Sequence, residues 1–147
     1  MSIKTQIEQD IFAAMRSGDA LRKGTLRMAL SAIKLAEIDQ GTSLDEAAYI
    51  AILQKEIKSL RESIVDAERA GRPELAAEAE TEINILETYL PVQLDSHDLE
   101  IMAREAIAEV GATSPREMGQ VMKVLMPRIQ GRAEGSQVSQ VVRNLLG

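Results

Sequence analysis

The side chains that carry most enzyme chemistry are scarce in this chain of 147 residues, which has one histidine, His97, and no cysteine. The absence of cysteine excludes disulfides, thiolate metal ligands and cysteine nucleophiles. Ser31 and Ser63 have no histidine base to activate them. We interpret His97 as a solvated residue in the first turn of a helix. The residues therefore predict no catalytic site, no metal and no cofactor.

Acidic and glycine-rich segments are the remaining places to look for chemistry. One predicted helix carries five glutamates that could in principle form acid–base pairs: Glu74, Glu78, Glu80, Glu82 and Glu87. They spread around the helix, which is typical of a solvated face. Gly131 and Gly135 lack the preceding strand and the Lys-Ser/Thr pair of a phosphate-binding loop. Neither segment predicts a reaction.

Long basic side chains are more informative, because their spacing suits phosphate. Lys23, Arg27 and Lys34 are four and seven residues apart on one predicted helix, which places them within about 40° of one another. Further basic residues lie on the next helix and near the C-terminus: Lys55, Lys58, Arg61, Lys123, Arg128, Arg132 and Arg143. Spaced cations bind a phosphate backbone by neutralising it and releasing its counterions. The alternative interpretation is an ordinary charged surface that keeps the protein in solution.

Charge is distributed unevenly along the chain, whose net charge is -6. Residues 1–43 have a net charge of +1, residues 44–95 of -7, and residues 96–147 are neutral. The acidic middle leaves a nucleic-acid role open only at the two ends. Two tyrosines and one phenylalanine are too few to stack on unpaired bases. Any RNA target is therefore expected to be folded and duplex-like, recognised by shape and phosphate.

Glycine and proline interrupt the last third of the chain, at Gly111, Pro127, Gly131 and Gly135. Glycine inside a helix costs about 1 kcal/mol and proline about 3 kcal/mol, so such interruptions predict tight reversals or a close approach to a partner. The basic residues Arg128 and Arg132 lie in the most interrupted part. We expect a recognition loop here, in which Gly131 and Gly135 let the backbone approach the partner.

Apolar residues recur at helical spacing throughout the chain, and no strand pattern competes with them. The expected helices begin near Ser2, Asp19, Ser43, Pro73, Asp95, Ser114 and Ser136. Asp19 is expected to cap the second helix. Ser43 with Glu46, and Ser114 with Glu117, are expected to form capping boxes. The sequence thus predicts an all-α protein.

Two neighbouring helices carry matched apolar seams, which predicts a long antiparallel hairpin. The seams consist of Ile50, Leu53, Ile57, Leu60, Ile64 and Ala67, and of Ala76, Ala79, Ile83, Leu86 and Leu90. The periodicity then breaks between Tyr89 and Leu94. We expect a bundle of about four helices over residues 1–91 and a smaller three-helix subdomain over residues 95–147.

Several motifs in the right order resemble the GatB/YqeY family of small bacterial helical proteins, over essentially the whole length. The motifs are Arg27-Met28 with Ser31-Ala32-Ile33-Lys34, Gln54-Lys55-Glu56-Ile57-Lys58 with Arg61 and Ser63, Ala70-Gly71-Arg72, Tyr89-Leu90-Pro91 with Gln93-Leu94, Met118-Gly119 with Val121-Met122, Met126-Pro127, and Gly131-Arg132-Ala133 with Gly135. One departure is Glu134, where the family often has aspartate. The charge is kept.

The resemblance implies a helical bundle followed by a three-helix unit. In this family the module forms the tail of the B subunit of a glutamine-dependent tRNA amidotransferase and is attached to some glutaminyl-tRNA synthetases. There it helps to hold tRNA, while other domains form the amide. Members are often labelled as carbon–nitrogen ligases with glutamine as amido donor. We regard that label as inherited, because this sequence holds no residues for the reaction.

The leading hypothesis from the sequence is a non-catalytic, tRNA-binding accessory module. Lys34, Lys58 and Arg132 are expected to contact phosphate, supported by Arg27, Lys123 and Arg128. The alternative is a protein-interaction module that docks on an amidotransferase or an aminoacyl-tRNA synthetase without touching RNA. Apolar runs of only a few residues exclude a transmembrane helix. Without a signal peptide or cysteine, we expect the cytoplasm as the location. The resemblance implies a bacterial source.

Overall fold

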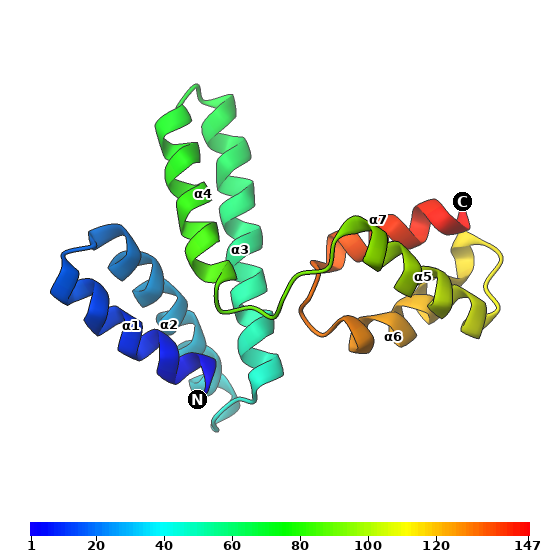
Figure 1. Ribbon diagram of the computed structural model, residues 1–147, viewed down its shortest axis with the longest axis horizontal. Coiled ribbons are helices and arrows are strands. Elements are labelled where there is room, and N and C mark those ends of the chain that lie inside the picture. The colour runs from blue at the N-terminus through cyan, green and yellow to red at the C-terminus, as the bar shows by residue number, and fades with distance from the viewer. The chain divides into compact units, whose positions relative to one another are not determined.

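The structure, a computed structural model, describes all residues from 1 to 147 and contains helices but no strand, which confirms the all-α prediction. Its elements are α1 (Ile3–Ser17), α2 (Ala20–Gln40), α3 (Glu46–Arg69), α4 (Pro73–Glu87), α5 (Ser96–Val110), the 3₁₀ turn η1 (Pro115–Glu117), α6 (Met118–Ile129) and α7 (Gly135–Leu146) (Figure 1). None of these helices is both long enough and apolar enough to cross a membrane. The chain forms two compact units, unit 1 (Met1–Leu90) and unit 2 (Pro91–Gly147).

In unit 1, α1 and α2 lie side by side as an antiparallel pair (Figure 1). Gly18 has a φ of 76°, a left-handed conformation that glycine adopts readily, and it ends α1. The Asp19 side chain accepts a hydrogen bond from the backbone N–H of Arg22, which confirms Asp19 as the N-cap of α2. The apolar side of the pair, including Ile7 and Ile33, is buried in the core of unit 1.

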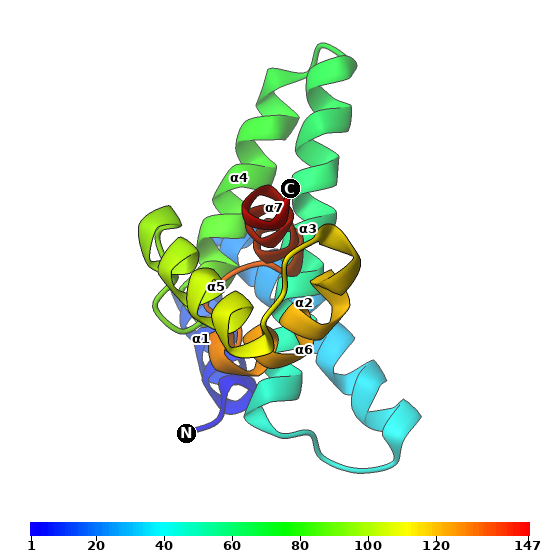
Figure 2. The same cartoon turned by 90° about the vertical axis from the view of Figure 1, so that its right-hand side faces the viewer.

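The longest helix, α3, packs antiparallel against α4 (Figures 1 and 2). Leu53 and Ile57 from α3 share one core with Ile83 and Leu86 from α4. Pro73 opens α4, at a position where the missing backbone N–H leaves no hydrogen bond unmade. Because both seams are apolar along their length, the two helices bury each other's faces while charged residues remain outside.

The start of α3 differs from the prediction. Its N-cap is Asp45, which accepts from the backbone N–H of Ala48 at 2.9 Å, so the capping box expected at Ser43 is wrong. Glu46 instead accepts from the backbone N–H of Ile3 at 3.0 Å. A carboxylate directly before the first helical residue satisfies the free N–H groups, which releases Glu46 to bridge to α1.

In unit 2, three helices surround an aliphatic core. The fully buried members are Leu99, Ala103 and Ala106 of α5, Val121, Leu125 and Ile129 of α6, and Val138 and Val142 of α7. Several aliphatic residues and four partly buried methionines pack around this core: Met102, Met118, Met122 and Met126. The unit is therefore held together by its own apolar contacts.

Two predictions about the middle of unit 2 are wrong in detail. Ser114 makes no side-chain cap, and the chain passes through η1 before α6 begins at Met118. Pro127 and Arg128 lie inside α6 instead of in a loop. Proline removes one intrahelical hydrogen bond, and this loss is confined to the last turn because α6 ends at Ile129.

A buried tyrosine ties the end of unit 1 back to its first helix. The Tyr89 hydroxyl donates a hydrogen bond to the Asp10 carboxylate, across 79 positions of sequence. The pKa of Tyr89 is raised above its ordinary value of 10.0. Burial of the hydroxyl is the largest cause, and the hydrogen bond to Asp10 and the negative charge of Asp10 add to it. Because the pKa of Tyr89 is higher in the folded than in the unfolded protein, protonated Tyr89 stabilises the fold. This contribution is fully present below pH 10 and is lost as the pH rises above 10.

Substituting Tyr89→Phe is expected to cost about 1–3 kcal/mol at neutral pH, because Asp10 loses a charge-assisted hydrogen bond. The variant should also lose less stability than the parent protein as the pH rises above 10, because it lacks the hydroxyl whose ionisation the folded state resists. Chemical denaturation followed by circular dichroism at each pH measures both effects. Equal alkaline loss in the two proteins would contradict the role assigned to Tyr89.

Candidate nucleic-acid interface

Arg27 and Lys34 lie exposed on the side of α2 that faces away from its buried residues. The nearest polar contact of Arg27 is from its Nη2 atom to the Met15 sulfur at 3.8 Å, and neither cation forms an ion pair. Lys23, expected on the same face, is half-buried. The structure thus places the predicted pair on one rigid helix, with no carboxylate to neutralise them.

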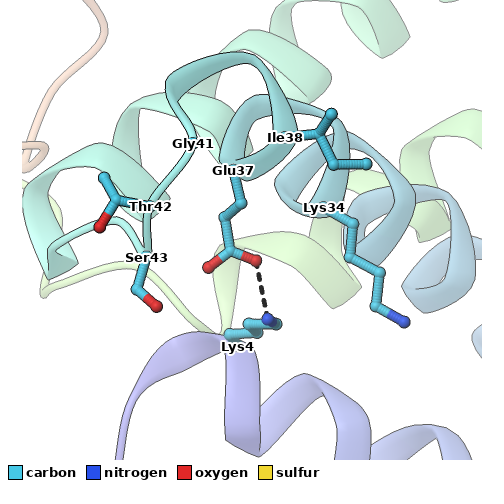
Figure 3. Close-up of a pocket in the computed structure, with 7 residues that line it drawn as sticks. All are labelled: Lys4, Lys34, Glu37, Ile38, Gly41, Thr42 and Ser43. Carbon is cyan, nitrogen blue, oxygen red and sulfur yellow. Dashed lines mark hydrogen bonds and ion pairs between the residues drawn. The ribbon is translucent and has the colours of Figure 1, made fainter.

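An open pocket of about 540 Å³ lies at the C-terminal end of α2 (Figure 3). Its lining consists of Lys4, Lys34, Glu37, Ile38, Gly41, Thr42 and Ser43. The Lys4 amine binds the Glu37 carboxylate at 2.7 Å, whereas the Lys34 side chain extends away from that pair (Figure 3). Lys34 is therefore the available positive charge at this pocket.

The pair beside Lys34 has a structural role in unit 1. Its mutual hydrogen bond, opposed by desolvation, raises the pKa of Lys4 and lowers the pKa of Glu37. The Tyr49 hydroxyl also donates to Glu37, at 3.2 Å. These three side chains come from α1, α2 and α3, so the Glu37 carboxylate joins three helices at one point. It is already engaged, which leaves the exposed Lys34 to interact with a ligand.

The basic residues of α3 have different surroundings. Lys58 is exposed and forms no ion pair, whereas the Nη2 atom of Arg61 contacts the Glu87 carboxylate at 3.1 Å and so links α3 to α4. Lys58 does not line the pocket that Lys34 lines. Unit 1 therefore brings Arg27 and Lys34 onto one helix and holds Lys58 on another.

In unit 2, the three residues predicted to contact phosphate differ in whether their side chains already have a partner within the protein. Lys123 is exposed on α6 without an ion pair. Arg128, in the last turn of α6, forms an ion pair with Glu109 of α5. Arg132 is half-buried, and its Nε atom donates to the Val92 carbonyl at 3.1 Å. Only Lys123 among these three is free of a protein partner.

The two glycines of the expected recognition loop differ: the backbone conformation explains Gly131 but not Gly135. Gly131 has a φ of 80°, which a residue with a side chain adopts only with strain. Its carbonyl accepts a hydrogen bond from the Gln93 amide at 3.0 Å. Gly135 begins α7, and a Cβ atom there would meet nothing closer than the Met126 side chain at 4.0 Å. The loop is thus fastened to the start of unit 2 by Gln93 and Arg132.

One apolar feature of α2 was not predicted from the sequence. Met28, Leu35 and Ile38 are 44%, 61% and 75% exposed on the outward side of this helix. Their spacing of seven and three residues was the available signal, but the same helix also carries an inward apolar side with Leu26 and Ile33. When both sides are apolar, periodicity alone does not show which one the fold covers.

These features define a small all-α protein of two units that presents basic and apolar side chains on rigid helices. The chain belongs to the family described as Yqey-like protein, whose pattern matches residues 4–146. The resemblance indicated by the motifs is thereby confirmed at the level of the family.

Curated relatives include fungal proteins named "Altered inheritance of mitochondria protein 41, mitochondrial". The one from Vanderwaltozyma polyspora is 38% identical over 57% of this chain and 46% of the relative. The one from Lachancea thermotolerans is 40% identical over the same shares, so in both the match spans about half the relative's length. The one from Pyrenophora tritici-repentis is 28% identical over 97% of this chain and 80% of the relative.

These names contradict the expectation of a bacterial, cytoplasmic protein, which we correct: the similar curated proteins are mitochondrial and come from fungi. The expectation of the cytoplasm rested partly on the criterion for a secretory signal peptide. Mitochondrial targeting segments are amphipathic and rich in arginine and serine, so that criterion does not distinguish the two compartments.

Proposed function

We propose that this protein is a non-catalytic accessory module that binds tRNA, related to the tail of tRNA-dependent amidotransferases. The observation that carries the proposal is a set of exposed cations without carboxylate partners in both units: Arg27, Lys34, Lys58 and Lys123. Phosphate binding is the function for which unpaired, well-spaced cations are suited.

The proposed roles differ between residues. Lys34, Lys58 and Lys123 supply point charges that displace counterions from the RNA backbone. Arg132 holds Val92 through Nε and offers its remaining guanidinium N–H groups to a phosphate. Arg128 contributes only by exchanging Glu109 for phosphate, so its share is smaller.

Filter binding of total tRNA at about 50 mM and about 200 mM salt tests the proposal. Binding should weaken steeply with salt. Replacing Lys34, Lys58 and Lys123 together by alanine should reduce the slope of log affinity against log salt by about one for each phosphate that the protein no longer neutralises. Binding that ignores salt, or that survives the triple substitution unchanged, would contradict the proposal.

A matched control is available on α5. Arg104 is exposed, and its guanidinium pairs with the Glu100 carboxylate at 2.7 Å. The substitution Arg104→Ala therefore removes one positive charge that already has a carboxylate partner. This variant should change tRNA affinity less than Lys34→Ala does. If the two variants behave alike, the effect reflects net charge and does not arise from a defined set of phosphate-binding residues.

A second function, docking on a protein partner, is favoured by one observation: α2 carries large apolar residues that are exposed. Phosphate does not account for large apolar side chains in water, whereas a protein partner does. An accessory module that delivers RNA to an enzyme needs both kinds of surface.

A further inference from the structure

The outward side of α2 carries a continuous apolar seam, which we call the α2 outer face. It consists of Gly24, Met28, Ser31, Leu35 and Ile38, at successive spacings of four, three, four and three residues. This repeat keeps all five positions on one side of a helix and is the pattern by which helices pair. None of the three large side chains belongs to the core cluster of unit 1.

The seam has the dimensions of a helix-binding site. From Gly24 to Ile38 it extends for about 21 Å, which is about four helical turns. The small residues Gly24 and Ser31 lie on either side of Met28 along the seam, and they leave room there for a partner's side chains. A pocket lies near each end of the seam. One has Met15 and Lys23 in its lining, and the other is the pocket described above, which Lys34 and Ile38 help to line.

The charges beside the seam select among possible occupants. Arg27 and Lys34 each precede a seam residue by one position, so they form a basic edge along it. A second copy packed antiparallel would place Arg27 of one copy beside Lys34 of the other, where like charges repel. A second copy packed parallel would place Gly24 against Gly24 and Ser31 against Ser31, leaving two of the five layers without apolar packing. Neither arrangement fits both the charge and the packing.

We propose that the α2 outer face binds an acidic amphipathic helix of a partner protein. Large apolar residues of that helix pack over Gly24 and Ser31, and its flanking carboxylates pair with Arg27 and Lys34. RNA fits this face less well, because phosphates would bind the two cations and leave Leu35 and Ile38 in water. The inference does not rest on tRNA binding and holds whether or not RNA is bound elsewhere.

One consequence distinguishes helix docking from the proposed RNA interface. A docked helix covers Arg27 and Lys34 but leaves Lys58, on α3, and Lys123, in unit 2, uncovered. Saturation with the helix should therefore remove only the α2 share of tRNA binding. If tRNA binding is absent altogether, helix docking is still expected and still measurable.

The test uses the full chain and a synthetic helical peptide of about 18 residues, with leucines at alternating spacings of four and three and glutamates on both flanks. A second peptide carries lysines in place of the glutamates. Fluorescence anisotropy should show binding of the acidic peptide and affinity at least about tenfold weaker for the basic one. Equal binding of both peptides, or no binding of the acidic one, would overturn the inference.

Two variants of the protein locate the site. Replacing Leu35 and Ile38 together by alanine should weaken binding of the acidic peptide by about tenfold or more, because the seam then has too little apolar surface to bury. Replacing Arg27 and Lys34 by glutamate should reverse the preference toward the lysine peptide, which a merely destabilised fold would not do. Val65→Ala removes an apolar side chain that is 45% exposed on α3 and should leave binding unchanged.

Two other occupants would be recognised by the same variants. Concentration-dependent dimerisation in sedimentation velocity that disappears in the Leu35/Ile38 variant would assign the face to a second copy and overturn the inference. Loss of tRNA affinity in that variant, with no peptide binding by the parent protein, would assign the face to RNA and overturn it equally.

Discussion

Replacing Leu86 by alanine is expected to lower the free energy of unfolding of unit 1 by about 2–5 kcal/mol. Leu86 has no solvent exposure and belongs to the core that α3 and α4 share with the first two helices. Its truncation leaves a cavity in addition to removing the transfer free energy of the deleted atoms. Against a total stability of about 5–15 kcal/mol, this is a large fraction.

Urea denaturation followed by circular dichroism measures the effect. Leu75→Ala is the matched control, because Leu75 lies on the same helix and is 43% exposed. We expect the control to change stability by less than about 1 kcal/mol. Similar losses in the two variants would mean that α4 does not bury the face described above.

Replacing Leu125 by alanine is expected to unfold a substantial part of unit 2 while unit 1 stays folded. Leu125 is fully buried in the middle of α6, in a core separate from that of unit 1. The loss of about 2–5 kcal/mol is severe for a small unit, because small domains bury a lower fraction of their surface and begin with less stability.

Amide hydrogen exchange measured residue by residue separates the two units. Protection should fall across α5, α6 and α7 and remain in α1 to α4, whereas Ile101→Ala, at a position 43% exposed on α5, should leave both units protected. Loss of protection in all helices of the Leu125 variant would show that the units fold as one cooperative body instead.

Most of the helical fold could be predicted because it depends on local signals. The helix expected to begin near Ser2 is Ile3–Ser17, and the helix expected near Asp95 is Ser96–Val110. Both Ser96 and Asp95 are possible caps by residue type, and Asp95 is the one that the structure uses. Apolar spacing and a capping carboxylate lie within a few residues of each other, so the sequence displays them directly.

The wrong helix starts show where local signals compete. Ser43 and Asp45 are both good caps, and the structure uses Asp45, two residues later. Ser114 is followed by proline and glutamate, yet η1 forms first and no cap is made. At the first of these starts Glu46 bonds to Ile3 of α1 and not to its own helix end, a tertiary contact that the local pattern does not display.

The candidate site was predictable only in part, for a similar reason. The shared face of Arg27 and Lys34 follows from helix geometry alone. The partner of Arg128 is Glu109, 19 positions away, and that of Arg132 is Val92, 40 positions away. Such pairings depend on how the helices pack, and no spacing rule displays them.

The placement of the aromatic residues has a practical spectroscopic consequence. Tyr49 and Tyr89 are both buried in unit 1, and the chain has no tryptophan. Intrinsic ultraviolet fluorescence and near-ultraviolet dichroism therefore report on unit 1 alone, and unit 2 melts without any signal in either. A tryptophan introduced at a half-exposed position such as Val124, on α6, would give the second unit an optical reporter of its own.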